Sequence, residues 1–269
     1  MDTFRAQYAD MSDPAWQPQL VAQLRDHGLV TITGITDRGA LLAIARQVMT
    51  IRAHRDAAPD GVTEITDIGA TASGHAAFTD SELIPHTDGS SVPEPPTLLL
   101  LGCVKPADDG GATQVVDGAR IVSTLAEKHP AALRSLSAPR SAHFGGAGGH
   151  LGAVLEPAGL DRIRIRLRLD DLVRFSADAA AEIPALRAVI SRHLTTMHLE
   201  PGDGLLLCNT RWLHGRDQFV GHRIMLRVLG DPLPDIGVPP GFPAPVTRAR
   251  RLPRDSGTDS VDSLARRIA

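Results

Sequence analysis

Short apolar runs separated by turn-forming residues dominate this sequence beyond about residue 97. The most apolar of them is TLLLLGCV, residues 97–104, which lies between VPEPP and KPADDGG. Runs of this length bounded by Gly, Pro and Asp are typical of buried strands, and several in succession predict a β-sandwich or barrel. The other runs that predict strands are residues 27–35, 112–118, 161–170, 202–209 and 223–231.

Helical periodicity is confined to a few segments, which we expect to flank the strands. Asp37 is a suitable N-cap for a helix with Leu41, Ala45 and Val48 on one face. We predict the other helices at about residues 14–25, 119–128 and 178–197. The prediction is therefore a mainly β protein with flanking helices.

We expect a single domain over all 269 residues. We expect its core at about 27–231, and a Pro- and Arg-rich C-terminal tail, 232–269, that lies over the surface or is partly disordered. Since the N-terminus has no basic start followed by an apolar stretch, we expect no secretory signal.

Composition excludes several classes of function. The net charge of −3 gives no general attraction to nucleic acid or an anionic membrane, and no apolar run reaches the length of a membrane span. Aromatic residues make up 3% of the chain, so stacking surfaces for single-stranded nucleic acid are not expected. Cys103 and Cys208 lie in apolar runs and are expected to be buried free thiols of a cytosolic protein.

Three His-x-Asp/Glu triplets offer a possible metal-binding pair. They are His54-Arg-Asp56, His86-Thr-Asp88 and His198-Leu-Glu200. With 11 His and 31 acidic residues, chance alone gives roughly one such triplet, so the pattern decides nothing without its context. The first is expected at a solvated helix end, and the last at a strand start before a turn.

The triplet His86-Thr-Asp88 has the most suitable context. It follows the apolar pair Leu83-Ile84 and precedes a proline-rich loop. In a strand, residues two apart point to the same side, so an imidazole and a carboxylate could bind one ion. Catalytic iron sites often use two His and one carboxylate, and His214, after an apolar strand, is the best candidate for the third ligand.

A pair of arginines follows in the sequence HRIMLRVLGD. Arg223 and Arg227 are four residues apart, so a strand puts both on one face, with Met225 between them. An inward-facing guanidinium is suited to binding a carboxylate through two hydrogen bonds. Two surface arginines on an edge strand would give the same sequence pattern, and the strand pattern alone does not distinguish these alternatives.

Taken together and in order, these motifs resemble the iron(II)/2-oxoglutarate oxygenases of the taurine dioxygenase and clavaminate synthase-like family. The segments that carry the resemblance are IPHTDG, DGGATQVVDG, PGDGLLLCNTRWLHGRDQF and RIMLR. It covers about residues 27–231. It implies a double-stranded β-helix, or jelly-roll, with helices outside it.

The resemblance also implies roles for individual residues. His86, Asp88 and His214 match the iron ligands, which are also the catalytic residues. Thr113 and Arg223 match the residues that hold the distal carboxylate of 2-oxoglutarate. Arg227 matches an arginine that often meets an acidic group of the substrate. The spacing from His214 to Arg223 is shorter than expected for the family, so Arg227 could instead be the 2-oxoglutarate arginine.

The expected cofactors are Fe(II), 2-oxoglutarate and O2. Because Asp88 is a carboxylate, where related halogenases have a small residue, the resemblance implies hydroxylation, desaturation or ring closure and not halogenation. We expect a small polar substrate, an amino acid or a related carboxylate; a carrier-protein-tethered substrate is also possible. Arg168 and Arg166 are candidate substrate contacts if the face of RIRIRLRLDD that carries them looks inward, and the alternative is a solvated outer face.

Two other classes of function remain open at this stage. A zinc hydrolase or cupin-type isomerase could use two His and an Asp, but would not need Thr113 and Arg223. A non-catalytic β-sandwich binding module would have no reason to bring three metal ligands together. The oligomeric state is not predicted.

Overall fold

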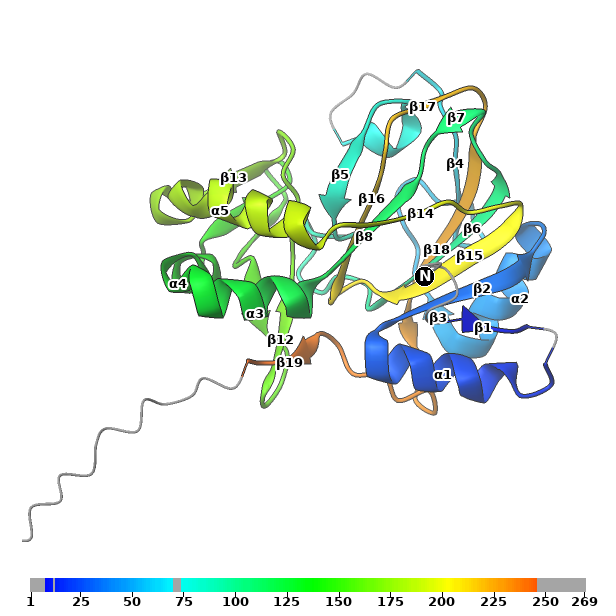
Figure 1. Cartoon of the computed structure of the whole chain (residues 1–269), viewed down its shortest axis with the longest axis horizontal. Helices are drawn as coiled ribbons and strands as arrows, with labels where there is room; N and C mark the ends of the chain where they lie inside the picture. Colours follow the sequence, from blue (N-terminus) through cyan, green and yellow to red (C-terminus); the bar gives the residue numbers. More distant parts are fainter. Residues whose placement is uncertain (1–7, 12, 70–73, 246–269) are drawn as a thin grey trace, which may run out of the picture.

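Two sheets form the centre of the protein in the computed structural model, which describes residues 8–11, 13–69 and 74–245 (Figure 1). Both are antiparallel, apart from the short parallel pair β1–β2. The larger sheet has the order β1 (Tyr8–Ala9), β2 (Leu29–Ile35), β15 (Gly202–Cys208), β6 (Leu98–Lys105), β18 (Ile224–Pro232) and β3 (Met49–Ile51), with β4 (Val62–Ile65) also on β18. The smaller sheet has the order β14 (Thr195–Met197), β8 (Thr113–Asp117), β16 (Trp212–Arg216) and β5 (Leu83–His86).

The leucine run of β6 explains how the two faces of the larger sheet are used. Successive side chains of a strand point to opposite faces. Leu98 and Leu100 pack with the helices on the outer face, while Leu99 and Leu101 join a second cluster that includes Val115 of the smaller sheet. Both faces of β6 are therefore buried, which is why its sequence is apolar without alternation.

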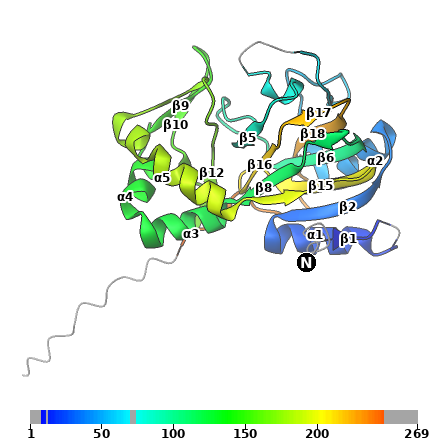
Figure 2. The ribbon, with the colours of Figure 1, turned by 45° about the horizontal axis from the view of Figure 1, so that its top comes forward.

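Helices α1 (Trp16–His27) and α2 (Arg38–Val48) cover the outer face of the larger sheet (Figures 1 and 2). The Asp37 side chain accepts a hydrogen bond from the Ala40 backbone N–H, as expected of an N-cap. Gly28 ends α1 with a φ of 69°, a left-handed conformation that favours glycine. The turn sets the direction in which β2 enters the sheet.

A second group of elements packs beside the smaller sheet, where α3, α4 and α5 lie together (Figure 2). The helices are α3 (Gly118–Lys128), α4 (Pro130–Ser137) and α5 (Ala177–His193). The short strands are β9 (Ala142–Phe144), β10 (His150–Gly152), β11 (Leu155–Pro157), β12 (Arg162–Ile165), β13 (Val173–Phe175) and β19 (Phe242–Pro243). The remaining elements are β7 (Asp109–Gly110), β17 (Phe219–Val220) and the short helix η2 (Ala76–Phe78).

The predicted mainly β fold with flanking helices is confirmed, with differences at several ends. The strand predicted at 161–170 ends at Ile165, and the side chain of Arg166, the next residue, is buried. The helix predicted to reach 197 ends at His193, and β14 follows it. Residues 246–269 of the predicted tail lie outside the described residues, but β19 pairs with β12 and buries Phe242.

Two further expectations concern the whole chain. Cys103 and Cys208 are buried free thiols, as predicted. None of the helices in the described ranges has the length and apolar character that a membrane crossing requires.

Candidate active site

His86 and His214 face each other across two neighbouring strands. His86 ends β5 and His214 is in the middle of β16, and the two are direct partners in the antiparallel register. Side chains at such paired positions lie close together on one face of a sheet. The two imidazole centres are 4.5 Å apart. The pairing of β5 with β16 thus brings together two histidines that are 128 residues apart in the sequence.

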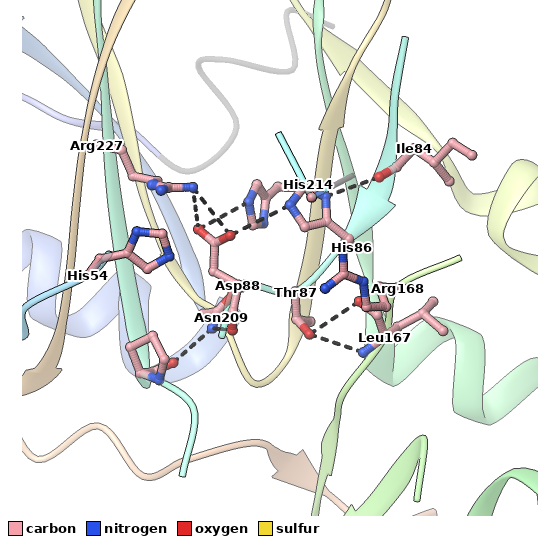
Figure 3. A network of polar contacts seen from close by, with 12 residues as sticks. His54, Ile84, His86, Thr87, Asp88, Leu167, Arg168, Asn209, His214 and Arg227 are labelled. Carbon is pink, nitrogen blue, oxygen red and sulfur yellow. Dashed lines mark hydrogen bonds and ion pairs between the residues drawn. The ribbon is translucent and has the colours of Figure 1, made fainter. Parts of the chain in front are cut away.

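Asp88 completes a cluster with the two histidines (Figure 3). One ligand atom from each of the three residues lies within 4.8 Å of the others. The Asp88 backbone is held by Asn209, which is fully buried: its Oδ1 accepts from the Asp88 N–H at 2.8 Å, and its Nδ2 donates to the Asp88 carbonyl at 2.9 Å. Asn209 also donates to the Pro96 carbonyl, so it fixes both ends of the loop between Asp88 and Pro96.

The donor chemistry of the cluster calls for a cation. His86 Nδ1 lies 3.1 Å from the Ile84 carbonyl, which can only accept, so Nδ1 carries a proton and Nε2 is the ring atom left to bind a metal. That Nε2 faces an Asp88 carboxylate oxygen at 3.6 Å, and His214 Nε2 faces the other at 3.7 Å. Burial lowers the pKa of His214 to about 3, so this imidazole is neutral.

Lone pairs that converge on a carboxylate fit a divalent metal ion, which would bind all three groups at once. Among the described residues, this is the one group of three or more His, Cys, Asp or Glu side chains with that geometry. Burial opposes ionisation of Asp88, but the charge of Arg227 favours it, and the pKa of Asp88 lies well below its usual value. The carboxylate is therefore charged and available as a ligand.

Arg227 lies directly beside this cluster. Its Nη1 donates to both Asp88 oxygens, at 3.3 and 3.0 Å, and its Nε is buried with no hydrogen-bond partner among the described residues. Arg227 lines a cavity of about 620 Å³ together with His86 and Asp88, the larger of the two cavities compared below. The role of Arg227 toward a substrate stays a prediction.

Arg223 and Thr113 meet in a different cavity, of about 360 Å³. Both side chains are buried, and Arg223 makes no hydrogen bond or ion pair within the described part of the chain. Its nearest charge-balancing contact is the ring of Phe219, 5.9 Å from the guanidinium carbon. Burial lowers the pKa of Arg223 to about 10, still well above neutral, so it remains a cation. A buried cation without an acidic partner is the feature expected of an anion-binding pocket.

Arg168 lines the larger cavity, where it forms an ion pair with Asp170. Arg166 does not line it. Its guanidinium is fully buried and donates to the backbone carbonyls of Ser90, Val92 and Pro93, and to Glu156 at 3.2 Å. Arg166 thus holds the cavity wall without facing its interior.

Sequence reasoning missed His54, which it assigned to a solvated helix end. His54 lines the larger cavity, and Figure 3 shows its ring turned toward Asp88 and Arg227. Its Nδ1 accepts from the Asp56 N–H at 3.3 Å, and burial together with Arg227 lowers its pKa. A neutral ring with a proton on Nε2 follows. The sequence feature that could have indicated His54 is the triplet His54-Arg-Asp56, which was interpreted as part of a solvated helix end.

The third triplet also lies near a cavity and not in the metal cluster. His198 and Glu200 line the smaller cavity, at its exposed side. In the sequence, Asn209 was visible only as part of the segment PGDGLLLCNTRWLHGRDQF. Its hydrogen bonds to both ends of the loop could not be predicted from that segment.

Comparison with known families finds a match over residues 3–229 to the model described as "Taurine catabolism dioxygenase TauD, TfdA family". Among curated proteins, human gamma-butyrobetaine dioxygenase is 26% identical over 122 residues, as is the Pongo abelii protein of the same name. That match covers 44% of this chain and 29% of the human protein. The matched stretch thus spans less than a third of these curated relatives.

Solved structures share the fold at low sequence identity. An asparagine oxygenase in complex with Fe(II), 3-hydroxyasparagine and succinate superposes with a TM-score of 0.61 at 14% identity, covering 81% of this chain and 85% of that one. The non-heme iron oxygenase OrfP with Fe and alpha-ketoglutaric acid gives 0.60 at 20%, covering 84% and 87%. The PvcB protein from Pseudomonas aeruginosa gives 0.62 at 17%, covering 82% and 84%.

Proposed function

This chain belongs to the TauD/TfdA family of dioxygenases, and from that premise we propose that it is an Fe(II)- and 2-oxoglutarate-dependent oxygenase. It acts on a C–H bond of a small polar substrate, an amino acid or a related carboxylate. The observation that carries this proposal is the combination of the His86, Asp88 and His214 cluster with Arg223, a buried cation that pairs with no acidic side chain among the described residues. The first suits a metal and the second suits an anion.

His86, Asp88 and His214 would hold the iron. Bound Fe(II) supplies the site at which O2 oxidises 2-oxoglutarate to succinate and CO2, so that the second oxygen atom can be used on the substrate. Asn209 keeps Asp88 in place through its backbone, and the Ile84 carbonyl keeps the His86 lone pair on the side of the metal. Such supporting hydrogen bonds orient metal ligands and keep them basic.

Arg223 and Thr113 would hold the distal carboxylate of 2-oxoglutarate. A guanidinium donates two parallel hydrogen bonds to a carboxylate, and the Thr113 hydroxyl can donate a third. Arg227 is less suitable for this role because it is already hydrogen-bonded to Asp88. We therefore keep Arg223 as the 2-oxoglutarate residue, in a reaction that hydroxylates, desaturates or cyclises its substrate.

The larger cavity would take the substrate. It is lined by side chains of both charges, including the pair Arg168–Asp170 and Arg227. That set suits a molecule with both a carboxylate and an amino group. The structural neighbours support an amino-acid substrate, since their complexes contain 3-hydroxyasparagine and 3-hydroxy-arginine. An amino acid tethered to a carrier protein is a second candidate for this cavity. The cellular location is a separate point: the two buried free thiols support a cytosolic protein.

The test is succinate formation by the purified protein with Fe(II), 2-oxoglutarate and O2, screened against amino acids. His86→Ala and Asp88→Ala should lose bound iron and succinate formation together, because each removes a ligand. His193→Ala is the matched control, since His193 bonds Thr124 on a helix away from the site. Normal succinate formation by either ligand variant would overturn the assignment. Iron binding without any 2-oxoglutarate turnover would instead favour a metal-dependent hydrolase or isomerase.

A further inference from the structure

Among the residues that the structure describes, the two cavities share no lining residue. The floor of the smaller cavity consists of buried side chains, among them Cys103, Thr113 and Arg223. Its rim consists of exposed residues: Asp108, Asp109, His198 and Glu200. The smaller cavity therefore runs from the core to solvent on its own side of the protein.

Strand β18 shows how the cavities are arranged. Every second residue from Arg223, which directly precedes the strand, to Leu229 lines one of the two cavities. Arg223 and Met225 line the smaller cavity, while Arg227 and Leu229 line the larger one. At about 3.3 Å per residue this stretch spans roughly 20 Å, so the cavities follow each other along the strand. The boundary falls at Arg227 and its partner Asp88.

We infer that the smaller cavity is a separate entrance for 2-oxoglutarate, through which this co-substrate reaches Arg223 and succinate leaves without passing the substrate cavity. The inference rests on the proposed function. Its volume of about 360 Å³ exceeds the space that one five-carbon dicarboxylate needs, given that a water takes up about 30 Å³. The excess space is the passage between the Arg223 guanidinium and the exposed rim.

The charges along this passage predict how an anion would move through it. Three carboxylates, Asp108, Asp109 and Glu200, surround the rim, and the cation Arg223 lies at the floor. A dianion is repelled at the rim and attracted at the floor. Because salt screens exposed charges, higher ionic strength should speed the arrival of 2-oxoglutarate at the wild-type protein. An entrance through the larger cavity would pass a wall of mixed, paired charges instead.

The experiment measures the association and dissociation rates of 2-oxoglutarate with the anaerobic Fe(II) protein, by stopped-flow absorption, without any turnover. Glu200→Trp places a bulky side chain at the rim of the smaller cavity. Glu82→Trp is the matched control, because Glu82 is an exposed glutamate that lines the larger cavity. Glu200→Gln removes the charge without adding bulk, and should leave the fold intact if the Trp variant does not.

We expect Glu200→Trp to slow association and dissociation of 2-oxoglutarate by about tenfold each, because a narrower path hinders movement in both directions. The Kd should stay within about threefold of the wild-type value. Glu82→Trp should leave both rates within twofold of the wild type, and Glu200→Gln should speed association at low salt. The inference is overturned if Glu82→Trp slows the exchange and Glu200→Trp does not, or if Glu200→Gln leaves the association rate and its salt dependence unchanged. Failure of the proposed function would give a different result, because the wild-type protein itself would then not bind 2-oxoglutarate.

Discussion

Two buried arginines of this protein differ in one respect that decides their roles. Arg166 is surrounded by acceptors: three backbone carbonyls and the carboxylate of Glu156. Arg223 is also buried, but within the described residues it has neither a carbonyl nor a carboxylate partner, only the edge of a cavity. A buried charge without a partner destabilises a folded protein, so Arg223 is maintained for a ligand and Arg166 for the structure.

Substituting these two arginines should therefore have opposite effects on stability. Arg223→Met should leave the free energy of unfolding unchanged or raise it by about 1 kcal/mol, because it removes an uncompensated charge. Arg166→Met should lower it by about 3 kcal/mol, since Glu156 and three carbonyls lose their donor. Urea unfolding of the metal-free proteins measures both. Arg223→Met should also weaken 2-oxoglutarate binding about 100-fold in calorimetry, a loss of about 2.7 kcal/mol.

A destabilisation of Arg223→Met as large as that of Arg166→Met would contradict this assignment. It would mean that Arg223 has a structural role. The burial of Arg223 would then no longer indicate that the smaller cavity binds an anion.

The loop between Asp88 and Pro96 is the element that forms one wall of the larger cavity. Asn209 holds its two ends, and Arg166 holds the carbonyls of its middle part. The Asp170–Arg168 pair also lines this cavity. Because Asp88 begins this loop, the same hydrogen bonds that shape the cavity wall also fix a proposed metal ligand.

Arg166→Lys should loosen this loop, because a lysine ammonium cannot reproduce the planar fork that bonds several carbonyls at once. Hydrogen exchange of residues 89–96 should speed up by about tenfold, which corresponds to about 1.4 kcal/mol of lost protection. Arg162→Lys is the matched control: Arg162 donates to the carbonyls of Pro240 and Gly241, away from this loop. Equal exchange rates in the two variants would contradict the role given to Arg166.

Glu156, which accepts a hydrogen bond from Arg166, should make the stability of the folded protein depend on pH in the acidic range. Burial opposes its ionisation, but Arg166 and Arg164 outweigh that effect and hold the pKa of Glu156 below its usual value. A lowered pKa in the folded state contributes stability above the unfolded pKa, and this contribution is lost as the pH falls through the folded value. Glu156→Gln should therefore lower the Tm at pH 7 and reduce the further loss of Tm between pH 5 and about pH 3.5. Parallel Tm curves for variant and wild type over that range would show that the pair does not contribute.

The strands of the larger sheet could be predicted from sequence because each is a long apolar run between turn residues, as in β6 and β15. The short elements could not. Strands β9 to β13 have three or four residues each, too few to display a period, and α4 is an eight-residue helix that follows α3 directly. The pattern of Arg162 to Arg168 indicated one long strand, but the strand stops at Ile165, and Arg164 and Arg166 both bind Glu156.

At the scale of the whole molecule, the two facing sheets bring together residues that are far apart in the sequence. His86 and His214 meet through one strand pairing, and Asn209 reaches back to Asp88 across 121 residues. The sequence predicted the histidines and the carboxylate from their context and a family resemblance. It could not predict His54 at the cavity, or the division of the interior into two cavities, because both depend on how the loops fold over the sheets.

The central claim is that the cluster of His86, Asp88 and His214 and the Arg223 pocket bind the two ends of one 2-oxoglutarate. The most direct test is an anaerobic titration of 2-oxoglutarate in the presence and absence of Fe(II). If one ligand joins both groups, Fe(II) tightens 2-oxoglutarate binding, and 2-oxoglutarate tightens Fe(II) binding by the same factor, roughly 5- to 150-fold. His214→Ala should abolish this coupling. Equal affinities for 2-oxoglutarate with and without Fe(II) in the wild type would contradict the account.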